Sequence, residues 1–358
     1  MTTATDASPR IWLVIGDKPG DNAQVEIIAD ELGLPFEIKR VLPKPEYVLG
    51  KPRFEVSLEH LDLDRSDTLT APWPDLILTI GRRSSMAALW VQEKSGGHSK
   101  IVLLGRPKRW QERFALIIAP AQYQIPAAAN VLQLKLPLMR SSRQKIRQAV
   151  DTWRPKLSVL PKPLTALLIG GETKPFRFDA QAANELLQLA LQKAGEGHLY
   201  ISTSRRTPPE VVQALKEQLP PNTTLYCWSQ DPTDNPYFAL LGLADQFIVS
   251  GDSVSMMVEV ARLQHPLFIY QPPIKQPRRW RIQQSMARWM MRGGKTTSKL
   301  LYKLGLIRYS RDLLAFHSLL YQQGFATPLG ANIQADSKNA PEDEVSKVVD
   351  RIRQLLET

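Results

Sequence analysis

The sequence has very little cysteine and no long apolar run. Its single cysteine, Cys227, cannot form a disulfide within the chain and excludes a metal site built from several thiolates. No apolar stretch reaches the roughly 18 residues of a membrane-spanning helix. The first ten residues are polar and lack the basic start and apolar core of a secretory signal. We therefore expect a protein that stays in the cytoplasm without crossing a membrane.

Acidic residues are absent from one segment, residues 275–311. This basic segment holds eleven Lys or Arg, and the other 35 Lys and Arg equal in number the 35 Asp and Glu of the chain. The net charge of +11 is therefore a local patch, which indicates a particular anionic partner. Its apolar residues recur at helical spacing among the cations, as in helices that lie on anionic membranes, although core packing would give the same spacing. The expected membrane-surface residues are Arg278, Arg279, Arg281, Arg288, Arg292 and Lys295.

The partners follow from the same patch. We expect the protein to lie peripherally at the inner face of the membrane. We expect no nucleic-acid partner, because the segment matches no recognised RNA- or DNA-binding module despite its aromatic residues.

Short apolar runs alternate with stretches of helical spacing along most of the chain. The strands expected from these runs are residues 11–15, 36–42, 76–80, 101–104, 114–118, 130–134, 164–169, 198–202, 224–228, 247–249 and 267–270. Alternating strands and helices predict an α/β protein with parallel sheets. A length of 358 residues suits two domains of ordinary size.

Domain boundaries are predicted from composition. We expect residues 1–153 to form an N-terminal Rossmann-like domain and the proline-rich residues 154–163 to form a linker. We expect residues 164–311 to form a C-terminal Rossmann-like domain that ends in the basic segment. Residues 312–358 form helices, the last of which can cross back to the N-terminal domain.

The junction at residues 246–261 changes its hydrophobic period in the middle. An apolar run, residues 247–249, stops at Ser250-Gly251, and a helix capped by Asp252 or Ser253 follows at once. The small residues leave the helix N-terminus bare, which suits a phosphate. Glu259 lies about one turn further on, where a carboxylate can accept hydrogen bonds from two vicinal hydroxyls. An ordinary capped helix with a solvated Glu would give the same pattern.

Five motifs resemble one family. GDKPGDNAQ, PDLILTIGRRSS, IGGETKPF, STSRRTP and SGDSVSMMVEVA, spread over residues 11–273, are similar to the mitochondrial fission (elongated mitochondria) family and its bacterial relatives, which are regarded as glycosyltransferases. The resemblance implies two facing Rossmann-like domains of the GT-B glycosyltransferase type with a nucleotide-sugar cleft between them. Its plant members look like adaptors of a division machine. The sequence departs from the family at Asp21, where many relatives have His, and at residues 135–139.

Three functions stay open on this evidence. The first is a metal-independent glycosyltransferase that moves a sugar from a nucleotide sugar, such as a UDP sugar, to a lipid-linked or cell-envelope acceptor. The others are a nucleotide-sugar epimerase of similar fold and a non-catalytic, membrane-associated adaptor.

For the transferase we predict no metal and no cofactor besides the donor substrate. Asp21 or Asp17, both in the first βα loop, is the expected base, although Asp21 could instead cap a helix. The expected donor-binding residues are Gly170, Gly171, Ser204, Arg205, Arg206, Trp228, Ser253, Ser255 and Glu259.

Overall fold

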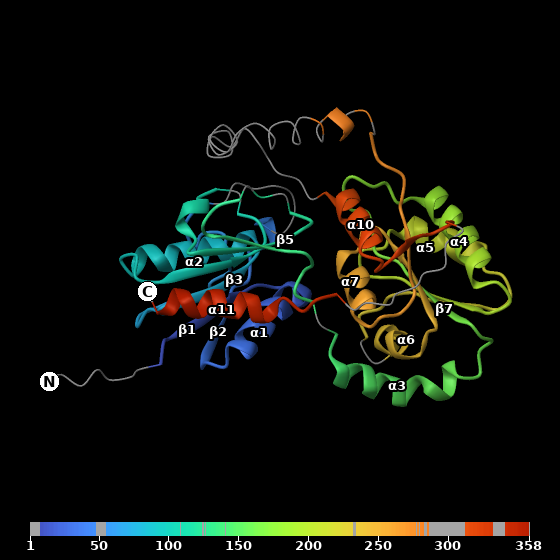
Figure 1. The fold of residues 1–358 in the computed structure, drawn as a ribbon, viewed down its shortest axis with the longest axis horizontal. Coiled ribbons are helices and arrows are strands. Elements are labelled where there is room, and N and C mark those ends of the chain that lie inside the picture. Colours follow the sequence, from blue (N-terminus) through green and yellow to red (C-terminus); the bar gives the residue numbers. More distant parts are fainter. Residues whose placement is uncertain are drawn as a thin grey trace. The chain divides into compact units, whose positions relative to one another are not determined.

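The structure of the chain is a computed structural model with two compact units. It describes residues 8–47, 55–107, 109–123, 125, 127–139, 141–231, 234–276, 278, 280–282, 285, 312–331 and 341–357. Unit 1 comprises Met1–Leu138, Ala287–Arg311 and Asp343–Thr358, and unit 2 comprises Met139–Met286 and Asp312–Glu342. Each unit contains a six-stranded parallel sheet with helices packed on it (Figure 1). The predicted fold class, an α/β protein with two Rossmann-like parts, is confirmed.

Unit 1 is built on a sheet with the strand order β2-β1-β3-β4-β5-β6. Its strands are β1 (Ile11–Ile15), β2 (Phe36–Arg40), β3 (Leu76–Ile80), β4 (Lys100–Leu104), β5 (Leu116–Pro120) and β6 (Val131–Leu134). Its helices are α1 (Pro19–Leu32), α2 (Arg82–Lys94) and α11 (Val345–Leu356), with short 3-10 turns at Pro45–Tyr47 and Gln111–Arg113. Side chains of β1 alternate between two cores: Leu13 packs with α1, and Val14 packs with α2.

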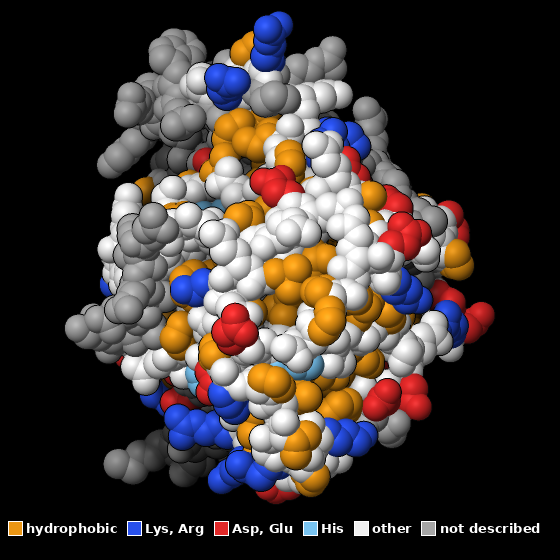
Figure 2. Space-filling view, turned by 90° about the vertical axis from the view of Figure 1, so that its right-hand side faces the viewer, with side chains coloured by type: hydrophobic (Ala, Val, Ile, Leu, Met, Phe, Trp, Pro, Cys, Tyr) orange, Lys and Arg blue, Asp and Glu red, His pale blue; other side chains and the backbone are white. Residues whose placement is uncertain are grey.

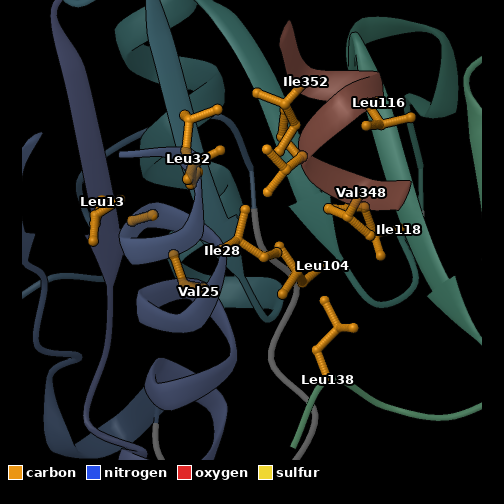
Figure 3. Packing of buried hydrophobic residues seen from close by; sticks show 14 of the residues in the cluster. Leu13, Val25, Ile28, Leu32, Leu104, Leu116, Ile118, Leu138, Val348 and Ile352 are labelled. Atoms are coloured by element: carbon orange, nitrogen blue, oxygen red, sulfur yellow. The ribbon is translucent and has the colours of Figure 1, made fainter. Parts of the chain in front are cut away.

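The C-terminal helix α11 completes the core of unit 1 beside α1 (Figure 1). Its residues Val348 and Ile352 point into the cluster that contains Leu116 and Ile118 (Figure 3). Glu344, just before α11, accepts a hydrogen bond from the backbone N–H of Lys135 at 2.7 Å. The last helix of the chain therefore belongs to the N-terminal unit.

Unit 2 has the strand order β12-β11-β10-β7-β8-β9. Its strands are β7 (Leu164–Leu168), β8 (His198–Ser202), β9 (Thr223–Tyr226), β10 (Gln246–Ser250), β11 (Leu267–Tyr270) and β12 (Thr327–Pro328). Its helices are α3 (Arg143–Leu157), α4 (Ala180–Ala194), α5 (Pro209–Glu217), α6 (Tyr237–Leu243), α7 (Val254–Arg262) and α10 (Leu313–Gln322). The central strands are apolar and buried, as expected for a parallel sheet covered on both faces.

The boundary between the units lies near residue 138, earlier than the linker predicted at residues 154–163. Helix α3 runs through Pro155 to Leu157 and packs on α6 of unit 2. Gly242 of α6 allows this close approach, because a Cβ at this position would lie 2.5 Å from Val150 Cγ2. The basic helix α3 is thus a packed helix of unit 2.

The strand orders place a ligand-binding edge in each unit. In unit 1 the chain adds β2 on one side of β1 and then β3 on the other side. In unit 2 it adds β8 and β9 on one side of β7 and then β10 on the other side. The strand order therefore reverses between β1 and β3 and between β7 and β10. Open α/β sheets bind ligands at the carboxyl ends of the strands at such points. The loops after β1, β3, β7 and β10 are therefore the places to look for a site.

Two surface properties bear on the membrane prediction. Among the described residues, no helix is both long and apolar enough to cross a membrane. Figure 2 shows the side on which α4 and α5 are drawn in Figure 1, where side chains of both charge signs are interspersed with hydrophobic ones.

Candidate functional site

The junction between β10 and α7 is organised around Asp252, whose side chain is fully buried. Its Oδ2 accepts a hydrogen bond from the Gly171 backbone N–H at 2.8 Å, and its Oδ1 accepts one from Ser250 Oγ at 2.7 Å. Burial raises the pKa of this carboxyl, and the bonds from Gly171 and Ser250 with the charge of Arg206 oppose the shift. Asp252 therefore ties the loop after β7 to the loop after β10 and is not the helix cap.

Arg206 is the cation that this carboxylate positions. One guanidinium nitrogen lies 3.2 Å from Asp252 Oδ2, and another donates to Thr173 Oγ1 at 2.9 Å. The Arg206 side chain is nevertheless 47% exposed, so it combines a fixed position with access to solvent. A guanidinium held in this way can bind a phosphate with little loss of side-chain entropy.

The first turn of α7 has no side-chain cap. The N-cap residue Ser253 makes no side-chain capping hydrogen bond, and the first N–H groups of a helix have no carbonyl partner within it. Ser255 and Glu259 are four residues apart and therefore share one face of α7. The rise of an α-helix separates them by about 6 Å along the axis.

Glu259 is held by two hydroxyl groups of unit 2. Ser141 Oγ and Tyr237 Oη each donate to Glu259 Oε2 at 3.1 Å. Burial raises the pKa of Glu259, whereas these two hydrogen bonds lower it. The solvated surface Glu considered from the sequence is therefore wrong, and the carboxylate is oriented by neighbours that lie far away in the chain.

His317 of α10 supports the turn after β10 from behind. Its Nε2 lies 2.7 Å from the Gly251 carbonyl oxygen, so the ring donates from this nitrogen, and the ring stacks on Phe176. Burial lowers the pKa of His317 to about 4, which keeps the ring neutral near pH 7. Gly251 is required here, because an added Cβ would lie 2.6 Å from this ring.

Several predicted donor-binding residues have internal roles. The N–H groups of Gly170 and Gly171 already donate to Ser250 and Asp252, so they are not available to a diphosphate. Added Cβ atoms at these glycines would collide with Asp252 and with the Arg206 backbone, which is why glycine is needed.

The other predicted donor-binding residues differ in where the structure places them. Ser204 Oγ donates to the Gly170 carbonyl, and Ser253 is only 2% exposed, so both build the loop rather than face a ligand. Arg205 is exposed beside Arg206. Trp228 follows the edge strand β9, three strands from β10, so the structure does not bring it to α7.

A pocket of about 140 Å³ lies in unit 1 at the carboxyl ends of β1 and β3. Both predicted bases line it. Asp17 Oδ1 accepts a hydrogen bond from Arg83 at 3.3 Å, whereas Lys18 Nζ lies 3.9 Å from Asp21 Oδ2. Asp21 is the less tightly paired of the two carboxylates and is therefore the better candidate for a base.

Helix α1 starts without a side-chain cap. The helix begins at Pro19, its N-cap residue is Lys18, and no side chain caps it. Asp21 therefore lies in the first turn and is not a cap, while the Asn22 side chain donates back to the Gly16 carbonyl at 2.9 Å. Proline at the first helical position is common, because the missing N–H would have had no helical partner.

The basic segment is described only in part. Among its described residues, Arg278, Arg281 and Ile282 are exposed. The other predicted membrane-surface residues, Arg279, Arg288, Arg292 and Lys295, lie outside the described residues.

The fold and the two edges define a class of protein: a two-unit α/β protein of the GT-B type with a candidate anion site in unit 2 and a charged pocket in unit 1. The chain belongs to the mitochondrial fission ELM1 family, whose sequence profile matches residues 19–296. The resemblance seen in the motifs is thereby confirmed.

Two relatives and one solved structure illustrate the similarity. An uncharacterized protein of Rickettsia prowazekii is 29% identical over 301 residues, which cover 74% of this chain and 83% of that protein. The mitochondrial fission protein ELM1 of Arabidopsis thaliana is 26% identical over 220 residues, which cover 55% of this chain and 51% of that protein. A Listeria monocytogenes structure assigned as a UDP-N-acetylglucosamine 2-epimerase matches with a TM-score of 0.53 and 14% identity, covering 98% of this chain and 97% of that one. This last match concerns the fold alone.

Proposed function

We propose that the protein is a metal-independent glycosyltransferase that uses a nucleoside diphosphate sugar. The acceptor hydroxyl oxygen forms a bond to the anomeric carbon, and the bond from that carbon to the diphosphate breaks. The leaving diphosphate keeps the electron pair, and the hydroxyl proton passes to a carboxylate of the protein. Catalysis then requires a site for the diphosphate and a base for the acceptor.

The arrangement of α7 carries this proposal. The uncapped first turn and the positioned Arg206 offer N–H groups and a positive charge to the diphosphate. Glu259 lies one turn after Ser255 on the same face of α7. A diphosphate bound at the first turn would therefore place the ribose of the same nucleotide near Glu259. Both hydroxyls that orient Glu259 bind Oε2, so Oε1 is the oxygen assigned to a ribose hydroxyl. The fold of the Listeria structure, assigned to an enzyme of UDP-N-acetylglucosamine, supports a uridine nucleotide.

The base of the proposed reaction is Asp21 of unit 1. It lines the pocket at the carboxyl ends of the strands, where acceptor groups can enter. Arg83 lies 3.3 Å from Asp17 Oδ1, whereas the cation next to Asp21, Lys18, lies 3.9 Å from its Oδ2, so Asp21 is the carboxylate that is less tightly paired. We assign the basic segment to the anionic membrane surface, where a lipid-linked or envelope acceptor would be presented.

Titration calorimetry with UDP tests the donor site. In Glu259→Gln the amide oxygen still accepts from Ser141 and Tyr237, but the charge is lost. Hydrogen bonds to a charged group are stronger than neutral ones by about 1–1.5 kcal/mol, so UDP affinity should fall about tenfold. Glu210→Gln is the matched control, because Glu210 is an exposed residue of α5 in the same unit. Equal UDP affinity in wild type and Glu259→Gln would refute the assignment.

The alternatives make different predictions in the same experiments. An epimerase would interconvert UDP sugars without any acceptor. An adaptor would bind neither UDP nor a UDP sugar, and Glu259→Gln would then have no effect beyond stability.

A further inference from the structure

We propose that Ser141 and Tyr237 are positioning residues of the donor site: they turn the carboxylate of Glu259 so that its outer oxygen binds the vicinal diol of a ribose, and they thereby select ribonucleotides over dideoxynucleotides. This inference rests on the proposed function, because it concerns the specificity of the same donor site. The two residues act through Glu259, whose carboxylate is the group that contacts the ligand.

The two oxygens of Glu259 have different surroundings. Oε2 accepts hydrogen bonds from Ser141 Oγ and Tyr237 Oη, each at 3.1 Å. Within the described residues Oε1 accepts no hydrogen bond and is not one of the buried polar atoms that lack a partner, so solvent reaches it. A carboxylate offers about four lone-pair sites to donors. The protein therefore fills the sites of Oε2 and leaves those of Oε1 to a ligand.

The two donors stand on elements that hold each other in place. Ser141 lies just before the N-cap residue of α3, and Tyr237 is the first residue of α6. Helix α3 packs closely on α6 at Gly242, and the Tyr237 backbone N–H donates to Asn235 Oδ1 at 3.0 Å. Because the donors are fixed, the carboxylate is oriented before a ligand binds and loses little freedom on binding.

The surroundings of Glu259 favour a hydroxyl over an anion as the bound group. Within the described residues, no Lys or Arg pairs with Glu259: burial raises its pKa, and the bonds from Tyr237 and Ser141 lower it. Burial and the charge of Glu259 raise the pKa of Tyr237 well above its usual value, so Tyr237 remains a donor at neutral pH. A charged carboxylate without a cation repels a phosphate and accepts further hydroxyl groups.

Calorimetry on the full chain with UDP and 2′,3′-dideoxy-UDP tests the inference. The readout is the ratio of the two affinities, because a change in diphosphate binding affects both nucleotides equally. The wild type should bind UDP about tenfold or more tightly than the dideoxy nucleotide. Tyr237→Phe and Ser141→Ala should each lower this ratio about threefold or more, and the combined variant should bring it close to that of Glu259→Ala.

A double-mutant cycle separates positioning from packing. If Tyr237 acts through Glu259, Tyr237→Phe lowers the ratio in the wild type and has no effect on it in Glu259→Ala. Loss of the Tyr237 bond also raises the pKa of Glu259, so on acidification the ratio of Tyr237→Phe should begin to fall at a higher pH than that of the wild type. A purely structural role of Tyr237 would produce neither result.

Tyr226→Phe is the matched control, because Tyr226 Oη is a buried hydroxyl of unit 2 without a hydrogen-bond partner in the described part of the chain. It should leave the ratio unchanged, and circular dichroism should show that all variants are folded. A wild-type ratio near one, or equal ratios in the wild type, Tyr237→Phe and Ser141→Ala, overturns the inference while the proposed function stands. Failure of the wild type to bind UDP overturns the proposed function and this inference with it.

Discussion

Replacing His317 by glutamine should remove a pH-dependent part of the stability of unit 2. The glutamine amide can still donate to the Gly251 carbonyl, but it does not titrate. The folded pKa of His317 is about 4, and the unfolded value is about 6.5. Because the folded pKa is the lower one, the stabilisation is fully present above the unfolded pKa and is lost as the pH falls from about 6.5 to about 4.

The size of this effect follows from the two pKa values. The folded and unfolded pKa values differ by about 2.5. The free energy of unfolding should therefore fall by about 3.4 kcal/mol once the pH is well below 4, and by about 2 kcal/mol at pH 5 relative to pH 8. His317 is 1% exposed, so solvent screening reduces the value little. Urea denaturation of wild type and His317→Gln at pH 8 and pH 5 measures it, since the difference between the two proteins cancels the contributions of other titrating groups.

The result that would refute this reasoning is a difference in unfolding free energy that is the same at both pH values. The ring would then be protonated or solvated in the folded protein, and the turn at Gly251 would lack the neutral donor that we assign to it.

Three further predictions concern the proposed reaction. The UDP affinity of the wild type, measured by calorimetry, should fall as the pH drops toward the pKa of Glu259. Because burial raises this pKa, the fall should begin at a higher pH than for an ordinary glutamate, and the affinity of Glu259→Gln should depend less on pH. Asp21→Asn should lower the rate of sugar transfer by about 10²-fold or more, while the circular dichroism spectrum and the UDP affinity stay unchanged. Normal turnover of this variant would assign the role of the base to Asp17. Cosedimentation with phosphatidylglycerol vesicles should decrease with salt and be absent with neutral vesicles, whereas preferential, salt-dependent binding to RNA would contradict the membrane assignment.

The strands could be predicted well because their signal is local. The runs Ile11–Ile15 and Leu76–Ile80 are short, mostly apolar and followed by glycine, and the structure places strands at the same residues. The start of α1 was harder to predict, because neither Lys18 nor Pro19-Gly20 is a side-chain cap. Helix boundaries without a cap carry little sequence signal.

The unit boundary depends on a contact that the sequence does not display. Proline at position 155 suggested a linker, but the packing of α3 on Gly242 of α6 keeps this stretch helical and in unit 2. Tertiary packing here overrides local propensity.

The candidate site was predicted in its outline but not in its details. Arg206 and Glu259 were identified from their place after a strand, yet their partners come from distant segments: Ser141 is 118 residues from Glu259 in the chain. Buried Asp252 appeared only as a cap candidate. Its role depends on its contacts with Gly171 and Arg206, which lie far away in the chain, and these contacts are a property of the three-dimensional structure.

Amide hydrogen exchange of the full chain with and without saturating UDP tests the central claim most directly. Binding at the start of α7 should slow exchange at residues 250–259 and at residues 203–207, which carry Arg206, while α4 (residues 180–194) stays unchanged as an internal reference. If UDP leaves the exchange of α7 unaltered, or slows it only in unit 1, the assignment of the donor site to this junction is contradicted.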